Sequence, residues 1–355
     1  MKLTHLTLRN FRSYPSCSLD FATGVNVIEG DNGTGKSNLA EAIYYLSLGK
    51  SLRNNDDRAL IRYGESGAYL AAEIVENSLL RHIEIFLAPT GRKILINGKP
   101  IHRLSELSKL VNVVLFSPED TGIFRGSPGE RRAFLDINLS KQSLDYFSLI
   151  GKHNRLLEER NAVLKTPKVD LTYLEVLTES LIEISEPLER YRRVYVDSLN
   201  KVLSSLESEL YGQSRTLLIA YRPFIKGDEF KEEAKKAYKR ALDGDIYHKV
   251  TSVGLQREDF SLMLDGKDVG VYGSQGENRL AAIALKLSPY FLIDDEEKKP
   301  LAVLDDIYSE LDEEHATRLS ALIKRLSQSF VTGTKIMIDG ATIIDVSPHK
   351  ATRRN

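Results

Sequence analysis

The sequence has very little cysteine and no long apolar run. Among its 355 residues there are one cysteine, Cys17, and seven histidines, which excludes a disulfide framework and a cysteine-based zinc site. No apolar run approaches the roughly 20 residues of a membrane-spanning helix, and the N-terminal residues lack the apolar block of a signal peptide. These absences favour a reducing, cytoplasmic setting.

The chain also has no excess of either charge. Its 49 Lys and Arg residues and 50 Asp and Glu residues give a formal net charge of −1, so a polyanion would have to bind at a local basic patch. A hydrophobic content of 42% and a charged content of 28% are those of an ordinary soluble globular protein. At this length we expect two lobes.

A glycine-rich loop stands where an apolar run turns into an amphipathic run. The loop lies between residues 24–29, which predict a strand, and residues 38–46, which predict a helix. Glycines let successive backbone N–H groups converge on phosphate oxygens, and the helix N-terminus adds a partial positive charge. The sequence therefore predicts a nucleotide-binding loop. The loop residues are Gly30, Asp31, Asn32, Gly33, Thr34, Gly35, Lys36 and Ser37.

Two side chains of this loop have predicted roles in binding the phosphates. Lys36 would bridge the β- and γ-phosphates, and the Ser37 hydroxyl would ligate Mg²⁺. Asn38, next along the chain, completes the predicted ATP-binding segment. We also expect Arg12 to reach the phosphates, because it is close in sequence to the first predicted strand.

An apolar strand that ends in two carboxylates predicts the second half of the site. Residues 301–304 are followed by Asp305 and Asp306, and α/β sheets place ligands beside the carboxyl ends of such strands. An acidic pair at a strand end is often only a solvated turn, but the phosphate loop favours a functional interpretation. Asp305 would hold Mg²⁺, and Asp306 would orient or deprotonate the attacking water. The predicted catalytic residues are thus Asp306, Asp305 and Lys36.

A second helix start in the chain is also suited to binding an anion. Ser274, Gln275 and Gly276 open a predicted helix and leave its N-terminus with little side-chain obstruction. This segment alone is compatible with an ordinary capped helix. Because one nucleotide does not need two such helix ends, we expect this one to serve the nucleotide of a second copy of the chain.

The predicted elements divide the chain into an α/β part and a helical insertion. Residues 1–125 and 245–355 alternate strands and helices, with closing strands at 329–332, 335–338 and 342–346. Residues 126–244 are mainly helical in pattern, with a long apolar stripe from 174 to 210. Both α/β parts carry half of the nucleotide site, so we expect them to form one head domain and the insertion to form a second lobe.

The order of these motifs resembles the ATP-binding-cassette ATPases of the SMC-like repair class, and within that class the RecF family. The resemblance extends over most of residues 2–334. Beyond the phosphate loop it rests on five segments, residues 8–14, 49–53, 114–120, 126–136 and 154–165.

This resemblance implies a cassette-type P-loop head with an inserted α-helical lobe, and ATP and Mg²⁺ as cofactors. It implies an ATP-driven homodimer in which the loop of one copy and Ser274 of the other enclose each nucleotide, with Ser309 and Asp312 in the loop after Asp306. Such a dimer would clamp double-stranded DNA near gaps or single/double-strand junctions and, with RecO and RecR, promote RecA loading. Its DNA-stimulated ATPase activity would be weak.

Several departures from related cassettes indicate slow hydrolysis. The family usually has Gly-Pro-His-Arg where this chain has residues 254–257, which read Gly-Leu-Gln-Arg. Transporter-type cassettes carry a glutamine near positions 117–120 and a switch histidine near 330–334, and this chain has neither. Thr332 or Gln256 would have to replace that histidine. Asp306 is shorter than the glutamate that is common at its position.

DNA contacts must come from a local concentration of cations, because the net charge is near zero. One candidate group, just beyond the phosphate-loop helix, consists of Lys50, Arg53, Arg58 and Arg62. A second group, in the helical insertion, consists of Arg190, Arg192 and Arg193. Either group is also compatible with an ordinary solvated face.

Two other function classes share the phosphate loop. An ATPase subunit of a membrane transporter is disfavoured by the missing glutamine and histidine and by the helical insertion. Another SMC-like repair or defence ATPase with a shortened coiled coil is the stronger alternative, although the segments at 114–136 and 154–165 favour the RecF family.

Overall fold

The computed structural model of the chain describes residues 1–51, 56–212, 215–227 and 229–354. Two compact units are formed from alternating parts of the chain. The first unit contains residues 1–121, 205–215 and 275–355, and the second contains residues 122–204 and 216–274.

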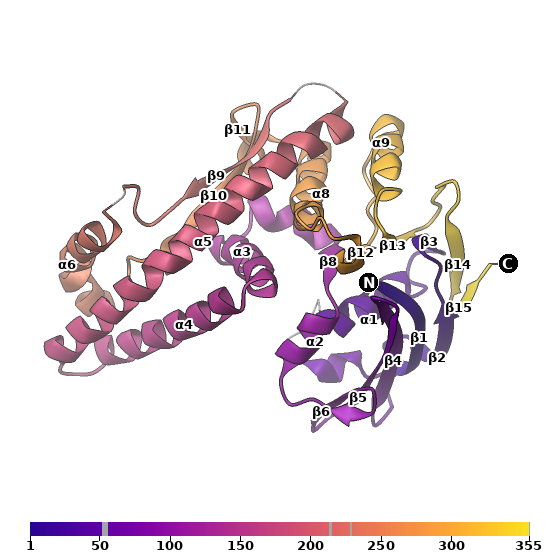
Figure 1. Cartoon of the computed structure of the whole chain (residues 1–355), viewed down its shortest axis with the longest axis horizontal. Helices are drawn as coiled ribbons and strands as arrows, with labels where there is room; N and C mark the ends of the chain where they lie inside the picture. The colour runs from indigo at the N-terminus through magenta and orange to yellow at the C-terminus, as the bar shows by residue number, and fades with distance from the viewer. Residues whose placement is uncertain (52–55, 213–214, 228, 355) are drawn as a thin grey trace. The chain divides into compact units, whose positions relative to one another are not determined.

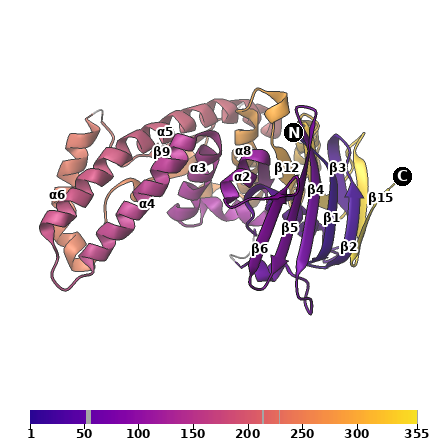
Figure 2. The same cartoon turned by 60° about the horizontal axis from the view of Figure 1, so that its bottom comes forward.

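The first unit contains an antiparallel sheet with the strand order β2-β1-β4-β5-β6-β7 (Figure 2). Asn97 and Gly98 form the tight turn between β6 and β7, and their φ values of 50° and 75° are those that such a turn requires. The strands are Lys2–Phe11 (β1), Tyr14–Asp20 (β2), Ala68–Glu76 (β4), Leu79–Ala88 (β5), Gly91–Ile96 (β6) and Lys99–Pro100 (β7).

A second, largely parallel sheet of the same unit has the order β15-β14-β3-β13-β12-β8. Its strands are Gly24–Glu29 (β3), Val113–Phe116 (β8), Leu301–Leu304 (β12), Gln328–Gly333 (β13), Thr342–Ser347 (β14) and Lys350–Arg353 (β15). The prediction of a strand at 335–338 is wrong, because residues 334–341 form a loop. Apolar Ile336 and Ile338 alternate with polar or exposed neighbours, as in a strand, because the loop buries both isoleucine side chains.

Helix α1, Lys36–Leu48, joins the two sheets into one core. It is buried on almost every side, as expected of a helix that packs between two apolar layers. Helix α8, Gln275–Phe291, packs against β8 (Figure 1). The remaining helices of this unit are α2 (Leu104–Leu110), α9 (Glu313–Ile323) and the short 3₁₀ turns η1 (Asp57–Leu60) and η4 (Glu296–Lys298).

The second unit is built mainly from long helices. The apolar stripe predicted for residues 174–210 lies on one helix of 41 residues, α5, which continues through Pro187. Three antiparallel strands in the order β11-β10-β9 belong to the same unit. Its elements are α3 (Pro128–Gln142), α4 (Leu144–Leu164), α5 (Leu171–Tyr211), β9 (Leu217–Arg222), α6 (Phe230–His248), η3 (Leu255–Arg257), β10 (Asp259–Leu264), β11 (Lys267–Asp268) and α7 (Val269–Tyr272). The 3₁₀ turn η2 (Pro118–Phe124) begins in the first unit and ends in the second.

The observed division of the chain differs from the predicted ranges 126–244 and 245–355. Residues 245–274 belong to the second unit, because β10 pairs with β9 over the whole length of both strands. Residues 205–215, including the last turns of α5, belong to the first unit. The pairing of β9 with β10 and the packing of the end of α5 depend on residues distant in sequence, so the local sequence pattern could not predict them.

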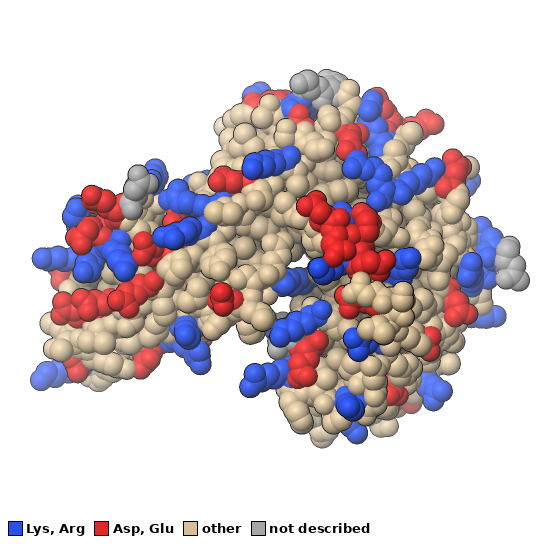
Figure 3. Space-filling view, viewed as in Figure 1, with Lys and Arg blue, Asp and Glu red and all other residues tan. Residues whose placement is uncertain are grey.

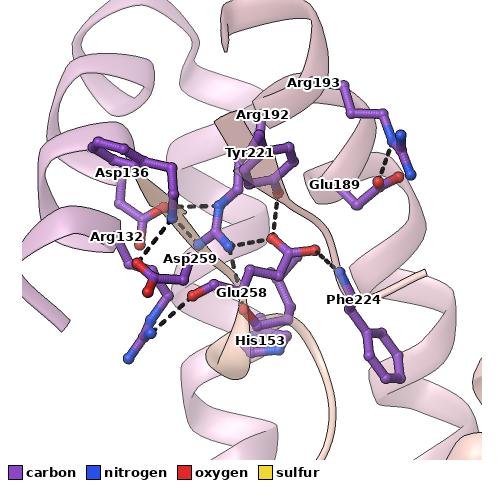
Figure 4. Close-up of polar contacts among 12 residues, drawn as sticks. Arg132, Asp136, His153, Glu189, Arg192, Arg193, Tyr221, Phe224, Glu258 and Asp259 are labelled. Atoms are coloured by element: carbon purple, nitrogen blue, oxygen red, sulfur yellow. Dashed lines mark hydrogen bonds and ion pairs between the residues drawn. The ribbon is translucent and has the colours of Figure 1, made fainter. Parts of the chain in front are cut away.

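A buried polar network stabilises the second unit (Figure 4). The guanidinium of Arg192, 2% exposed, donates to Asp136 of α3 at 2.7 Å and to Glu258 at 2.6 Å. Glu258 also accepts from the Tyr221 hydroxyl at 2.5 Å and the Phe224 N–H at 3.0 Å. Removing one partner of such a buried pair typically costs about 3–5 kcal/mol, so this network specifies how α3, α5 and β9 pack.

His153 of α4 lies beside this network and makes a testable contribution to pH stability. It is 1% exposed, and burial lowers its pKa from 6.5 to about 4. Below about pH 6.5 the unfolded chain therefore binds a proton at this histidine, whereas the folded chain binds it only near pH 4. The contribution of His153 to the free energy of unfolding consequently decreases as pH falls. Between pH 7 and 5 the loss from this one residue should be about 2 kcal/mol.

We expect His153→Gln to remove this part of the pH dependence. Urea unfolding at pH 7 and pH 5, followed by circular dichroism, measures the difference for the variant and the native chain. The nearby charges, Asp136 and Arg192, stay in place in both. An unchanged difference between the two pH values would show that His153 is protonated in the folded chain.

Candidate nucleotide site

A pocket of about 270 Å³ lies in the first unit, where the carboxyl ends of β3, β12 and β13 meet. Parallel strands present the residues that follow them at a common edge, which is how segments about 270 residues apart come together. The lining residues are Asn32, Gly33, Gly35, Lys36, Ser37, Asn38, Pro118, Glu119, Asp305, Asp306 and Thr332.

The loop between β3 and α1 adopts a conformation that requires its glycines. A Cβ atom on Gly30 would lie 2.2 Å from the Val346 carbonyl oxygen. Gly35 has a φ of 114°, and a Cβ there would lie 2.6 Å from the Ser13 hydroxyl. Gly35 is also the N-cap of α1, and no side chain caps this helix start by a hydrogen bond, which suits it to binding an anion.

The ammonium group of Lys36 is held by the loop itself. Its Nζ donates to the carbonyl oxygens of Gly30 and Asp31, both at 2.7 Å. Burial lowers the pKa of Lys36, and the carboxylates of Asp306, Asp305 and Asp31 oppose that shift. The ammonium group therefore lies at the pocket wall, where an anionic ligand would further stabilise its charged form.

Asp305 is the centre of a short chain of hydroxyl contacts. Its Oδ1 accepts from Ser37 at 2.9 Å and from Thr332 at 2.6 Å. The carboxylate comes from the end of β12, Ser37 from the start of α1, and Thr332 from β13. Asp305 is 3% exposed, and both donors stabilise its ionised form.

Asp306, the next residue, has a different environment. Its side chain is exposed at the pocket, and its backbone is in the left-handed region with a φ of 49°. The Asp306 N–H donates to Thr332 Oγ1 at 2.9 Å. Thr332 thus holds both acidic residues, one by its carboxylate and one by its main chain.

Arg12 does not line the pocket, contrary to the prediction. Its guanidinium makes two hydrogen bonds to Glu41 of α1, at 2.9 and 3.0 Å, and Glu41 is completely buried. A buried carboxylate requires a cation, and this requirement directs Arg12 to the side of α1. Of the predicted loop residues, Gly30, Asp31 and Thr34 support the loop from outside the lining.

The Ser274, Gln275 and Gly276 segment lies at the start of α8 and does not line this pocket. Ser274 and Gln275 are exposed. Of the two predicted residues after Asp306, Ser309 lies in the following turn. Asp312 is the N-cap of α9, where hydrogen bonds from His315 lower its pKa.

Two pocket residues were not assigned a role from the sequence. Pro118 and Glu119 begin η2 directly after β8 and line the pocket beside the phosphate loop. They lie in the segment 117–120, near which transporter-type cassettes carry a glutamine that this chain lacks. An acidic residue next to a strand end was the available signal, but its neighbour in space could not be known from the sequence.

The predicted DNA-contacting residues near α1 are partly engaged with acids. Lys50 is exposed, Arg58 is paired with Asp56, and Arg62 lies 3.8 Å from Glu65. Arg53 lies outside the described residues.

The second predicted cation group is corrected by the structure. Arg192 is buried in the network of Figure 4 and cannot contact a ligand at the surface. Arg193 is half-exposed and bonds to Glu189, and Arg190 is exposed, 3.8 Å from Glu186. The sequence placed these arginines on neighbouring positions of one helix, which point to different sides.

Comparisons with known proteins identify the family of this chain. The model of the RecF/RecN/SMC N terminal domain matches residues 2–352. The DNA replication and repair protein RecF of Geobacillus sp. (strain WCH70) is 35% identical over 347 residues, covering 95% of this chain and 93% of the relative. RecF of Staphylococcus carnosus (strain TM300) is 34% identical over 95% of this chain and 94% of its own length. The chain belongs to the RecF family.

Solved structures confirm the predicted cassette-type P-loop head fold. The recombination mediator protein RecF, solved as RecF-ATPrS, superimposes with a TM-score of 0.87 at 31% identity, covering 100% of this chain and 98% of that one. The SMC head bound to the C-winged helix domain of ScpA gives a TM-score of 0.61 at 18% identity, a likeness of fold alone. No helix among the described residues is long and apolar enough to cross a membrane.

The RecF-family pocket has a donor set that suits Mg²⁺. Within the described ranges, no group of three or more His, Cys, Asp or Glu residues could hold a metal. Ser37 and Asp305 instead offer two hard oxygen atoms 2.9 Å apart, and Mg²⁺ is commonly bound by one or two protein oxygens together with substrate phosphates. These two residues would hold the ion, which would neutralise phosphate charge when bound.

Of the two candidates for the missing switch histidine in this RecF-family chain, only Thr332 lines the pocket. Gln256 lies in η3 of the second unit, where its Nε2 donates to the Val253 carbonyl oxygen. Because Thr332 already donates to Asp305 at 2.6 Å, its hydroxyl proton is not available to a phosphate.

Proposed function

We propose that this chain is an ATP-gated DNA-binding switch of recombinational repair and replication maintenance. ATP would drive two copies into a homodimer that clamps double-stranded DNA near gaps or single/double-strand junctions. Lys36 would bind the β- and γ-phosphates, Ser37 and Asp305 would hold Mg²⁺, and Asp306 would orient or deprotonate the attacking water.

The observation that carries this proposal is that the phosphate-binding groups lie in two separate places. Lys36, Asp305 and Asp306 line one pocket, whereas residues 274–276 do not line it. Ser274 and Gln275 are exposed at the start of α8, so they are accessible to the nucleotide of a second copy. The solved relatives named RecF-ATP and RecF-ATPrS support ATP as the nucleotide.

Partners are proposed from the relatives. The solved RecF is described as a recombination mediator of the RecFOR pathway, which supports RecO and RecR as partners of this chain and RecA loading as the outcome. Basic and acidic side chains are interspersed on the face seen in Figure 3, so DNA binding would depend on local cations such as Lys50, Arg58 and Arg62. Such contacts weaken steeply as salt is raised.

The proposed ATPase activity is weak and stimulated by DNA. Asp306 is shorter than a glutamate, and Thr332 is engaged with Asp305 rather than free to act on the γ-phosphate. Slow turnover suits a switch, because the closed dimer must last long enough for partners to act on it.

Ser274→Arg tests the proposal, because it alters the presumed contact with the second copy and leaves the pocket intact. We expect the monomer to bind ATP as the native chain does, while ATP-dependent dimerisation is lost and hydrolysis falls by about 100-fold or more. Sedimentation with and without ATP, and with duplex, gapped and single-stranded DNA, measures the assembly. Ser204→Arg, at an exposed position of α5, is the matched control. Normal turnover by Ser274→Arg would show that the site is complete within one chain.

A further inference from the structure

The main chain of Asp306 is held from two sides by side chains of other elements. Its N–H donates to Thr332 of β13 at 2.9 Å, and its carbonyl oxygen accepts from Arg279 of α8. Its left-handed backbone, with a φ of 49°, is unfavourable for a residue with a Cβ. These two contacts therefore maintain a strained conformation and leave the carboxylate free at the pocket.

Arg279 is a buried cation whose contacts are directed mainly at the main chain. It is 3% exposed, and its Nε donates to the Ile307 carbonyl oxygen at 3.3 Å. Its carboxylate neighbour, Glu310, is 3.8 Å away and 56% exposed. The guanidinium also lies over the ring of Phe116 at 5.7 Å. The fork of an arginine can hold two adjacent carbonyl groups at once, which an ammonium group cannot do with the same geometry.

Helix α8 also holds a second part of the pocket lining. Lys286 pairs with Asp120 at 2.6 Å, and both side chains are largely buried. The other oxygen of Asp120 accepts from the Ser117 N–H at 2.8 Å and from its hydroxyl at 3.2 Å. The turn held by these contacts, residues 117–120, contains the two pocket-lining residues Pro118 and Glu119.

Arg279 and Lys286 thus connect one helix to two parts of the lining, after β12 and after β8. They lie about two turns apart, on the same side of α8. This helix begins directly after Ser274, the residue proposed to contact the nucleotide of a second copy. A shift of α8 as a rigid element would move the Asp306 main chain and the 117–120 turn together.

We infer that α8 couples the nucleotide bound by the second copy to the Asp305–Asp306 end of this chain's own site, with Arg279 and Lys286 as positioning residues. Neither residue lines the pocket. Arg279 sets the backbone of Asp306, and Lys286 sets the turn that carries Glu119. The inference rests on the proposed function, since it requires that Ser274 acts on a second copy.

Arg279→Gln and Lys286→Met test the two connections. We expect both variants to fold, with a lower melting temperature because each loses a buried contact, and to bind ATP as monomers within about twofold of the native affinity. Hydrolysis by the ATP-bound dimer should fall by about tenfold. Lys286→Arg should restore activity, and Arg279→Lys should restore it only in part. Arg325→Gln, an exposed arginine of the same unit paired with Glu209, is the matched control.

A double-mutant cycle with Ser274→Ala separates coupling from a merely structural effect. If Ser274 acts through Arg279, Ser274→Ala/Arg279→Gln should hydrolyse ATP about as fast as the slower single variant. If the two single losses of hydrolysis multiplied in the double variant, or if Arg279→Gln hydrolysed ATP at the native rate, the inference would be overturned. Either result would leave the ATP-dependent dimer of the proposed function intact. A native chain that fails to dimerise with ATP would instead overturn the proposed function.

Discussion

Lys36→Ala is expected to abolish ATP-dependent dimerisation. The Lys36 ammonium lies at the pocket wall, where it donates to the carbonyl oxygens of Gly30 and Asp31, both at 2.7 Å. Those neutral contacts can be exchanged for charge-assisted hydrogen bonds to phosphate, which are about twice as strong as neutral ones. Loss of hydrogen bonds to a charged group typically costs about 1.5–3 kcal/mol, so the affinity for ATP should fall by about 10–100-fold.

Sedimentation velocity over a range of ATP concentrations, with calorimetry of nucleotide binding, measures both effects. Lys93→Ala, an exposed lysine of β6, controls for the loss of one positive charge. The variant chain should melt near the native temperature, because Lys36 neutralises no buried carboxylate by direct contact. If Lys36→Ala dimerised with ATP at the native concentration dependence, the role assigned to this lysine would be refuted.

Asp306→Asn should bind ATP and dimerise normally but hydrolyse ATP about 100–1000-fold more slowly. An amide cannot take the proton of an attacking water, and general-base catalysis typically contributes about 10²–10⁴-fold. Asparagine tolerates the left-handed region as well as aspartate does, so the contacts of the Asp306 main chain with Thr332 and Arg279 should survive. The variant therefore changes the carboxylate without changing the conformation that presents it.

Single-turnover hydrolysis by the purified dimer measures the chemical step separately from product release. Asp339→Asn, at an exposed carboxylate beside Lys324, is the control for a changed surface charge. Undiminished hydrolysis by Asp306→Asn would assign the base elsewhere, and Glu119, which lines the same pocket, would be the next residue to test.

Local sequence patterns predicted most of the regular elements correctly. The strands at 25–29 and 301–304 and the helix after the phosphate loop were predicted because apolar runs, glycines and a helix start occur within one short window. The stripe from 174 to 210 predicted α5, a helix of 41 residues, because an amphipathic period sustained over so long a stretch is hard to produce by chance. Strand β2 was missed, since its buried residues, Tyr14, Cys17 and Leu19, are interrupted by Pro15.

The side-chain partners could not be predicted from the same patterns. Arg12 was expected at the phosphates, but Glu41 on a buried face of α1 binds it. Arg192 was expected at a surface, but Asp136 and Glu258 hold it inside the second unit. In each case a buried carboxylate elsewhere in the chain determines where the guanidinium lies, because an unpaired buried charge is far more costly than a lost surface contact.

The sequence by itself determined that this chain has a phosphate loop between a strand and a helix, an acidic strand end and a second helix start. These are local features, since glycine conformations, helix starts and strand ends depend on neighbouring residues. Only the tertiary structure decided that Asp305 meets Ser37 and Thr332, and that Arg279 and Lys286 of one helix hold two parts of the pocket lining. Those contacts join residues distant in sequence, and the order of strands in the sheet brings them together.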